Sequence, residues 1–178
     1  MSPDMPRGPL PPSSSQAAPS APDIRVYVRL GHAVARAQLL ELAMVKLLAE
    51  QKHNPRLSED ERWNKVFGWM RMSAGQLRKA LGIPEAVATD LRHVVDRRDR
   101  VVHKAWVLYA RGEDREASAD AWATYLDEEA AVFGFAFNGM MAMVHLVRAD
   151  STASQEALDA AWRRHVPEPV EPVAPRVP

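Results

Sequence analysis

One strongly charged segment of the chain, Asp90–Trp106, contains an arginine, an aspartate and a histidine that could work together. These residues are Arg98, Asp99 and His103. On a helix that turns about 100° per residue, Asp99 lies one turn before His103 and on the same face. A carboxylate beside an imidazole orients the ring and selects its tautomer, and such a histidine can exchange protons near neutral pH. The spacing therefore predicts general acid–base chemistry.

Arg98 stands in the middle of an apolar helical face. A buried charge is costly unless it is paired, so this arginine needs either a structural partner, for which Glu41 is a candidate, or a functional reason. Five positions separate Arg98 from His103, which is about 140° on an ideal helix. We therefore expect the two side chains to meet only where two copies of the helix face each other across a two-fold axis. The apolar residues of the face are Leu91, Val94, Val95, Val102, Ala105 and Tyr109.

The charge of this segment differs from that of the whole chain. The chain has 23 basic and 23 acidic side chains, which argues against a protein that coats nucleic acid through bulk charge. Between Arg92 and Lys104, however, basic residues outnumber acidic ones. Arg97 and Arg100 are predicted to point to the polar side of the helix, and with Lys104 they could hold an RNA backbone. A solvated helix face is the alternative explanation for all three.

The remaining sequence predicts an all-α protein. Apolar residues recur with the helical period almost throughout, and no segment alternates as a strand does. We expect an up-and-down helical bundle of three long helices plus shorter ones. Asp23 is predicted to cap the first helix, and Ser58 and Ser73 the two short helices that follow it. The expected helices cover about 24–51, a short stretch after Ser58, 73–81, 84–111, 116–148 and 154–165.

The composition of the two ends predicts tails around a single domain. Residues 1–22 are rich in Pro, Ser and Ala and are expected to be disordered, because they cannot bury enough apolar surface. Residues 166–178 are rich in Pro and are expected to form an extended tail. The helical domain is then predicted to span 23–165.

Several classes of site and location are not expected. The chain has no cysteine, and its histidines show no ligand spacing, so we expect no metal site. It has no Gly-rich phosphate loop, and we expect no cofactor. No signal peptide or uninterrupted apolar run long enough to span a bilayer is evident, so we expect a cytoplasmic protein without a membrane segment. A dense run of Phe and Met at 133–143 is interpreted as core, with a dimer seam or an antitoxin groove as the alternative.

The segment Arg98-Asp99-x-x-x-His103 resembles the R-x(4–6)-H motif of the HEPN superfamily. In that family a polar residue, usually Asn or Asp, commonly follows the arginine, and the motif lies within a long helix. The preceding residues, Leu91–Arg97, are similar to the family's apolar and basic run before the motif. Ser73–Leu81 also looks like the short helix that often precedes it. Lys104 departs from the pattern, since many members have glycine there.

The resemblance implies both a fold and an activity. HEPN domains are all-helical and usually dimerise with their motif helices facing each other. Many cleave RNA without a metal, through attack of the ribose 2′-hydroxyl on the adjacent phosphate, and many act as toxins or in antiphage defence. Carried over to this chain, His103 is the general acid or base, Arg98 binds the scissile phosphate, and Asp99 orients the site. A homodimer, an RNA substrate and an antitoxin protein are the implied partners.

Two other interpretations stay open from the sequence. The chain can be a non-catalytic HEPN dimer that acts as a binding or regulatory module. It can also be a helical scaffold in which Arg98 and His103 have only structural roles.

Overall fold

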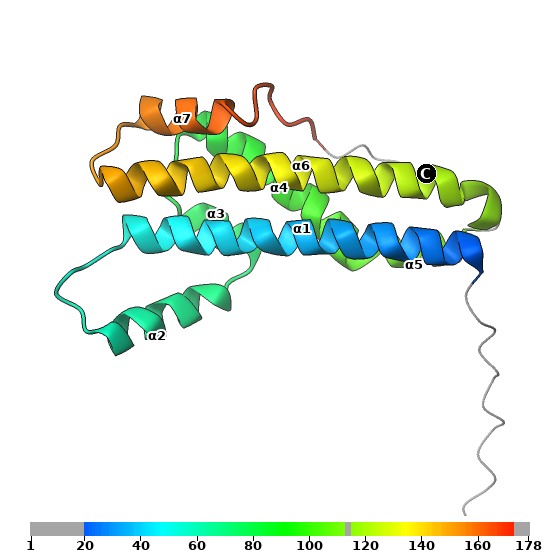
Figure 1. The fold of residues 1–178 in the computed structure, drawn as a ribbon, viewed down its shortest axis with the longest axis horizontal. Helices are drawn as coiled ribbons and strands as arrows, with labels where there is room; N and C mark the ends of the chain where they lie inside the picture. Colours follow the sequence, from blue (N-terminus) through cyan, green and yellow to red (C-terminus); the bar gives the residue numbers. More distant parts are fainter. Residues whose placement is uncertain (1–19, 113–114, 173–178) are drawn as a thin grey trace, which may run out of the picture.

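The computed structural model describes residues 20–112 and 115–172 of the chain. Within these residues the protein is all-helical, as predicted, and no strand occurs (Figure 1). The elements are α1 (Ala21–Gln51), α2 (Glu59–Met70), α3 (Ala74–Ala80), α4 (Glu85–Arg100), the π-helical turn η1 (Val101–Ala105), α5 (Trp106–Arg111), α6 (Arg115–Ala149) and α7 (Gln155–Arg163).

Two long helices, α1 and α6, run side by side in the same direction (Figure 1). Ion pairs join them near both ends, between Arg29 and Asp127 and between Arg148 and Glu50, where the Arg148 Nε to Glu50 Oε1 distance is 2.9 Å. The third long element, α4 through α5, runs in the opposite direction across them (Figure 1). It is this third element that carries Arg98 and His103.

Three helices begin at capping boxes, in which a serine and the side chain three residues later satisfy each other's backbone N–H groups. Ser58 and Ser73 cap α2 and α3, as predicted. The predicted cap of α1 is wrong. Ser20 is the cap, and Asp23 is the reciprocal partner at the third helical position, so the helix begins at Ala21. Asp23 also accepts a hydrogen bond from the Tyr109 hydroxyl at 2.9 Å, which ties α1 to α5.

The core lies between α1, α4 and α6. Met44 and Leu47 on α1 and Leu91 on α4 are fully buried. The run of Phe and Met on α6 contributes mainly to this core. Phe133, Met140 and Met143 are fully buried and Phe137 and Met141 are half-buried, whereas Phe135 is exposed.

The predicted helix from 84 to 111 has nearly the expected extent but a different internal geometry. Its backbone keeps right-handed helical dihedrals throughout, yet Val101–Ala105 form a π-helical turn. A π turn hydrogen-bonds five residues apart instead of four, so it contains one extra residue. The apolar face shifts accordingly, with Val101 buried and Val102 only half-buried.

The segment that follows α7 packs on α4 instead of leaving the domain at residue 166. Val166 is buried, and the backbone N–H of Val170 donates to Asp90 at 3.1 Å. Asp90 is itself buried and accepts from the Trp162 indole at 3.0 Å and from Arg163 at 2.6 Å. Residues 166–172 have no regular secondary structure, as expected for an extended segment, but they complete the surroundings of α4. The predicted tail residues 1–19 and 173–178 lie outside the described part.

Helix α6 also bears on the expectation that the chain has no membrane segment. The stretch Ala117–Ala149 is long and apolar enough to cross a bilayer by length and composition. The expectation of no membrane segment therefore does not follow from the absence of an uninterrupted apolar run. In the fold, this helix packs along α1 and supplies a large share of the core.

Candidate active site

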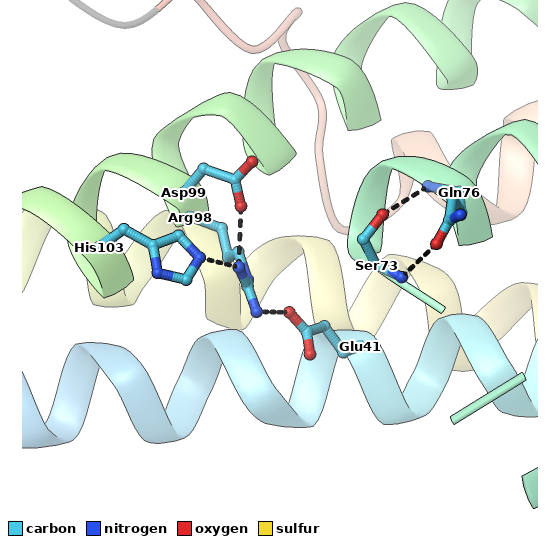
Figure 2. Close-up of polar contacts among 6 residues, drawn as sticks. All are labelled: Glu41, Ser73, Gln76, Arg98, Asp99 and His103. Carbon is cyan, nitrogen blue, oxygen red and sulfur yellow. Dashed lines mark hydrogen bonds and ion pairs between the residues drawn. The ribbon is translucent and has the colours of Figure 1, made fainter. Parts of the chain in front are cut away.

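The three residues predicted to carry the chemistry gather beside α1, where α4 passes into η1. Figure 2 shows Asp99 and His103 beside the guanidinium of Arg98, with Glu41 reaching it from α1. Arg98 Nη1 lies 2.8 Å from Asp99 Oδ1 and 3.1 Å from His103 Nε2. The Arg98 Nη2 group forms an ion pair with Glu41 Oε1.

The contact between Arg98 and His103 defines the state of the histidine. A guanidinium can only donate hydrogen bonds, so His103 Nε2 is the acceptor. An imidazole that accepts a hydrogen bond at Nε2 carries its proton on Nδ1. His103 is exposed, and its Nε2 lone pair accepts the hydrogen bond from Arg98. When Arg98 turns to a ligand, this lone pair becomes free to accept a proton.

The convergence of these two side chains within one subunit contradicts the prediction that they diverge. On an ideal α-helix, five positions correspond to about 140° of extra rotation. The π turn at Val101–Ala105 contains one extra residue per turn, so residues five apart face the same way. The argument that two copies of the helix are needed to bring Arg98 and His103 together is therefore wrong.

Contacts before α4 and after η1 attach the motif-bearing element to α1. The side-chain amide of Gln51, at the end of α1, donates to the carbonyl of Gly82 at 2.8 Å and accepts from its N–H at 3.0 Å, just before α4 begins. After η1, the indole of Trp106 stacks on Tyr27 of α1 with ring centroids 4.3 Å apart. Both anchors lie on α1, which fixes the π turn against the helix that supplies Glu41.

The carboxylates of the site are not arranged as the helical wheel predicts. Asp99 was expected to orient His103 directly, but within the described residues both side chains contact Arg98 and not each other. Glu41 is the partner that the structural interpretation of Arg98 predicts, and the ion pair confirms it. The guanidinium is thus shared by two carboxylates and an imidazole. Its Nε is buried without a hydrogen-bond partner among the described residues.

The prediction that Arg97 points to the polar side of the helix is wrong. Its guanidinium lies 2.9 Å from Glu129 of α6, and it donates through Nε to the carbonyl of Glu171 at 3.3 Å. Burial raises the pKa of Glu129, and the neighbouring Arg97 offsets part of that rise. Arg97 is therefore engaged in a largely buried ion pair with α6, whereas Arg98 pairs with Glu41 of α1.

The other two predicted RNA-binding residues lie in different surroundings. Arg100 is half-buried and acts electrostatically on Glu129 and on Tyr125, whose pKa is raised to about 12, mainly by burial. It therefore belongs to the α6 side of α4. Lys104 is exposed and comes directly after His103. Of the three predicted basic residues, Lys104 is the one placed to reach a ligand at His103.

Glu129 and Asp90 were not singled out from the sequence. Each is an acidic residue on the apolar face of its helix, Asp90 between Val87 and Leu91 and Glu129 between Leu126 and Ala130, and each is buried with an arginine partner. That placement was the available signal, and it is the same signal that drew attention to Arg98. Within residues 20–112 and 115–172, no three acidic or histidine side chains gather as metal ligands would.

Compared with known proteins, the chain matches no family model, no curated protein and no solved structure. The geometry of the site must therefore carry the functional argument by itself.

Proposed function

We propose that the protein is a metal-independent endoribonuclease of HEPN type. The observation that carries the proposal is the contact between Arg98 Nη1 and His103 Nε2, at 3.1 Å, in an exposed π turn. It joins a phosphate-binding group and a proton acceptor at hydrogen-bond distance. π turns occur frequently at functional sites, because they displace a side chain from the regular helical register.

In the proposed reaction, Arg98 turns from His103 to the phosphate, which frees the single lone pair of His103 Nε2, and this nitrogen takes the proton of a ribose 2′-hydroxyl. The 2′-oxygen then attacks the adjacent phosphorus, the bond to the 5′-oxygen breaks, and a 2′,3′-cyclic phosphate remains. The departing 5′-oxygen takes a proton from a second acid, for which the partner subunit's His103 in its protonated form is the candidate. Arg98 stabilises the negative charge on the phosphate, since its fork of donors matches two phosphate oxygens.

The phosphate has to replace one of the carboxylates that now hold Arg98. Asp99 is the one expected to yield, because its side chain is 55% exposed whereas that of Glu41 is 27% exposed. Water can solvate the released Asp99 at little cost. Glu41 would then keep the guanidinium oriented, and Lys104 would bind a neighbouring phosphate.

Apolar surface next to the motif supports the proposed homodimer. Val107 and Leu108, which follow η1 in α5, are large apolar side chains exposed to solvent, and so is Val28 of α1, whose neighbour Tyr27 stacks on Trp106. Contiguous exposed apolar surface commonly marks a protein–protein interface. We propose that two subunits meet there with their motif helices facing each other. A cytoplasmic toxin or antiphage effector, blocked by an antitoxin protein, is the role that fits such an enzyme.

The test is RNA cleavage by the wild type and by single variants in the presence of a metal chelator. We expect His103→Ala and Arg98→Ala each to lower the cleavage rate at least about 100-fold. His103→Ala should change the free energy of unfolding by less than about 0.5 kcal/mol, because the side chain is exposed. His145→Ala, which removes an exposed histidine of α6, is the matched control and should cleave as the wild type does. Full cleavage by the His103→Ala variant would refute the proposal.

A non-catalytic HEPN dimer is the second candidate, and the double pairing of Arg98 with Glu41 and Asp99 favours it. A guanidinium already neutralised by two carboxylates is a structural element until one of them moves. This candidate predicts that the wild type dimerises, as measured by analytical ultracentrifugation, but leaves RNA uncut.

A further inference from the structure

We infer that a pocket between α1 and α2 binds a nucleotide of single-stranded RNA. The pocket has a volume of about 520 Å³ and lies where α1 ends and α2 begins. That volume is within the range of small-ligand sites. Two indoles, Trp63 and Trp69, contribute to its wall. The choice of RNA over a free nucleotide rests on the proposed function.

Cationic side chains accompany the indoles. Lys52, Arg62 and Lys65 line the pocket and are exposed, and the salt bridges of the described residues involve other side chains. Of the two acidic residues in the lining, Glu50 is already paired with Arg148. The pocket therefore offers positive charge beside flat aromatic rings. A nucleotide, with a planar base and a phosphate, complements both.

The architecture of α2 leaves these aromatic side chains available. This helix buries no residue and projects from the bundle below α1 (Figure 1). Trp63 and Phe67 are each more than half exposed, with ring centroids 5.9 Å apart. Val66 and Trp69 hold α2 against the core, so the exposed rings of Trp63 and Phe67 remain as a stacking surface for bases.

A strand of RNA explains this surface better than a free nucleotide does, because further hollows lie along α2. Trp63 and Phe67 line a second hollow together with Asp60 and Asn64 of α2. One turn later, Met70 lines a third hollow together with Glu41, the partner of Arg98. Glu41 and Glu50 are nine residues apart on α1, or about 14 Å at 1.5 Å per residue. A short single strand can therefore lie across α2 and reach the catalytic guanidinium.

The experiment measures binding of a fluorescein-labelled 12-nucleotide oligo(A) by fluorescence anisotropy. All proteins carry His103→Ala, so that the RNA stays intact and binding is measured apart from cleavage. We expect Trp63→Ala to weaken binding about 10-fold, which corresponds to the loss of one stacked base. Lys52→Ala with Lys65→Ala should weaken binding and reduce its dependence on salt. Because α2 buries no residue, these variants should fold as the parent does.

Matched controls remove similar side chains outside the pocket. Phe135→Ala removes an equally exposed aromatic ring of α6, and Lys46→Ala removes an exposed lysine of α1. Both should bind as the parent does. Equal binding by the Trp63→Ala protein, or an equal loss with Phe135→Ala, would overturn the inference.

Two further arms identify the source of the nucleotide and separate this inference from the proposed function. AMP should compete with the labelled strand only weakly, whereas equal binding by AMP and the 12-mer would overturn the assignment to RNA. A protein that cleaves RNA through His103 but binds it independently of Trp63 refutes the pocket alone. Binding that depends on Trp63, without any cleavage by the wild type, refutes the proposed function alone.

Discussion

Two consecutive arginines of α4 face different neighbouring helices, and their environments differ sharply. Arg97 pairs with Glu129 of α6, whose side chain is 3% exposed, and residues 166–172 cover the pair. Arg98 pairs with Glu41 of α1, whose side chain is 27% exposed, and shares its guanidinium with exposed Asp99 and His103. The two arginine side chains are almost equally buried, at 18% and 17% exposed. The difference therefore lies in the partners, which are fixed on one side and exchangeable on the other.

This comparison distinguishes a structural ion pair from a reactive one. A buried carboxylate that loses its cation cannot be solvated, so its ion pair is required for folding. A partly exposed carboxylate can be solvated by water, so a ligand can take its place. The α6 side of α4 therefore holds an ion pair that folding requires, and the α1 side holds one whose exposed partner a ligand could replace.

The largest expected effect comes from removing each arginine in turn. Arg97→Ala leaves Glu129 buried without its partner and should reduce the free energy of unfolding by about 3 kcal/mol. Arg98→Ala leaves Glu41 within reach of water and should cost about 1 kcal/mol. Urea unfolding followed by circular dichroism measures both. A loss for Arg98→Ala as large as that for Arg97→Ala would remove the distinction between the two sides.

An intermediate effect is expected from deletion of Lys104, which should convert η1 into an ordinary α-helical turn. Removing one residue from a π turn restores the register of the helix after it. The packing of α5 and the Arg97–Glu129 pair should then persist, with a loss of about 1 kcal/mol in the free energy of unfolding. His103 should rotate away from Arg98, and cleavage should fall to the level of His103→Ala. Lys104→Ala, which removes the same side chain but keeps the π turn, is the control and should cleave faster than the deletion variant.

The smallest effect concerns the pH dependence of stability. Burial raises the pKa of Glu129 in the folded protein above its ordinary value of 4.5, so the folded state binds this proton more tightly than the unfolded chain does. The contribution of Glu129 to stability is therefore fully present below pH 4.5 and declines as the pH rises through the folded-state pKa. Glu129→Gln removes this dependence. Unfolding of both proteins at several pH values should show the wild type losing stability relative to Glu129→Gln as the pH rises.

Much of the fold could be predicted from local chemistry. Ser58 with Glu61 and Ser73 with Gln76 mark helix starts because each pair satisfies the backbone groups that a helix end leaves free. Asp23 was misplaced by three residues for a related reason. Aspartate suits both the cap and the third position of a capping box, and Ser20 decides between them.

The site was predictable in its members but not in its geometry. Arg98 and His103 stand out by type and spacing, and an arginine in an apolar stripe points to a partner such as Glu41. The π turn was missed because the helical wheel assumes 3.6 residues per turn, and contacts with another helix, such as the stacking of Trp106 on Tyr27, decide where that assumption fails. Arg97 was misassigned because a wheel shows one apolar stripe, whereas α4 is enclosed on a second side by α6 and residues 166–172.

The attachment of residues 166–172 to α4 has a consequence for how the protein is made. Asp90 and Arg97 obtain backbone partners from Val170 and Glu171, which are synthesised about 75 residues later. The helix that carries the motif cannot be fully enclosed until these residues have emerged from the ribosome. Docking of α4 is thus a late step of folding, because it depends on a segment that is synthesised 74 to 80 residues after the side chains it binds.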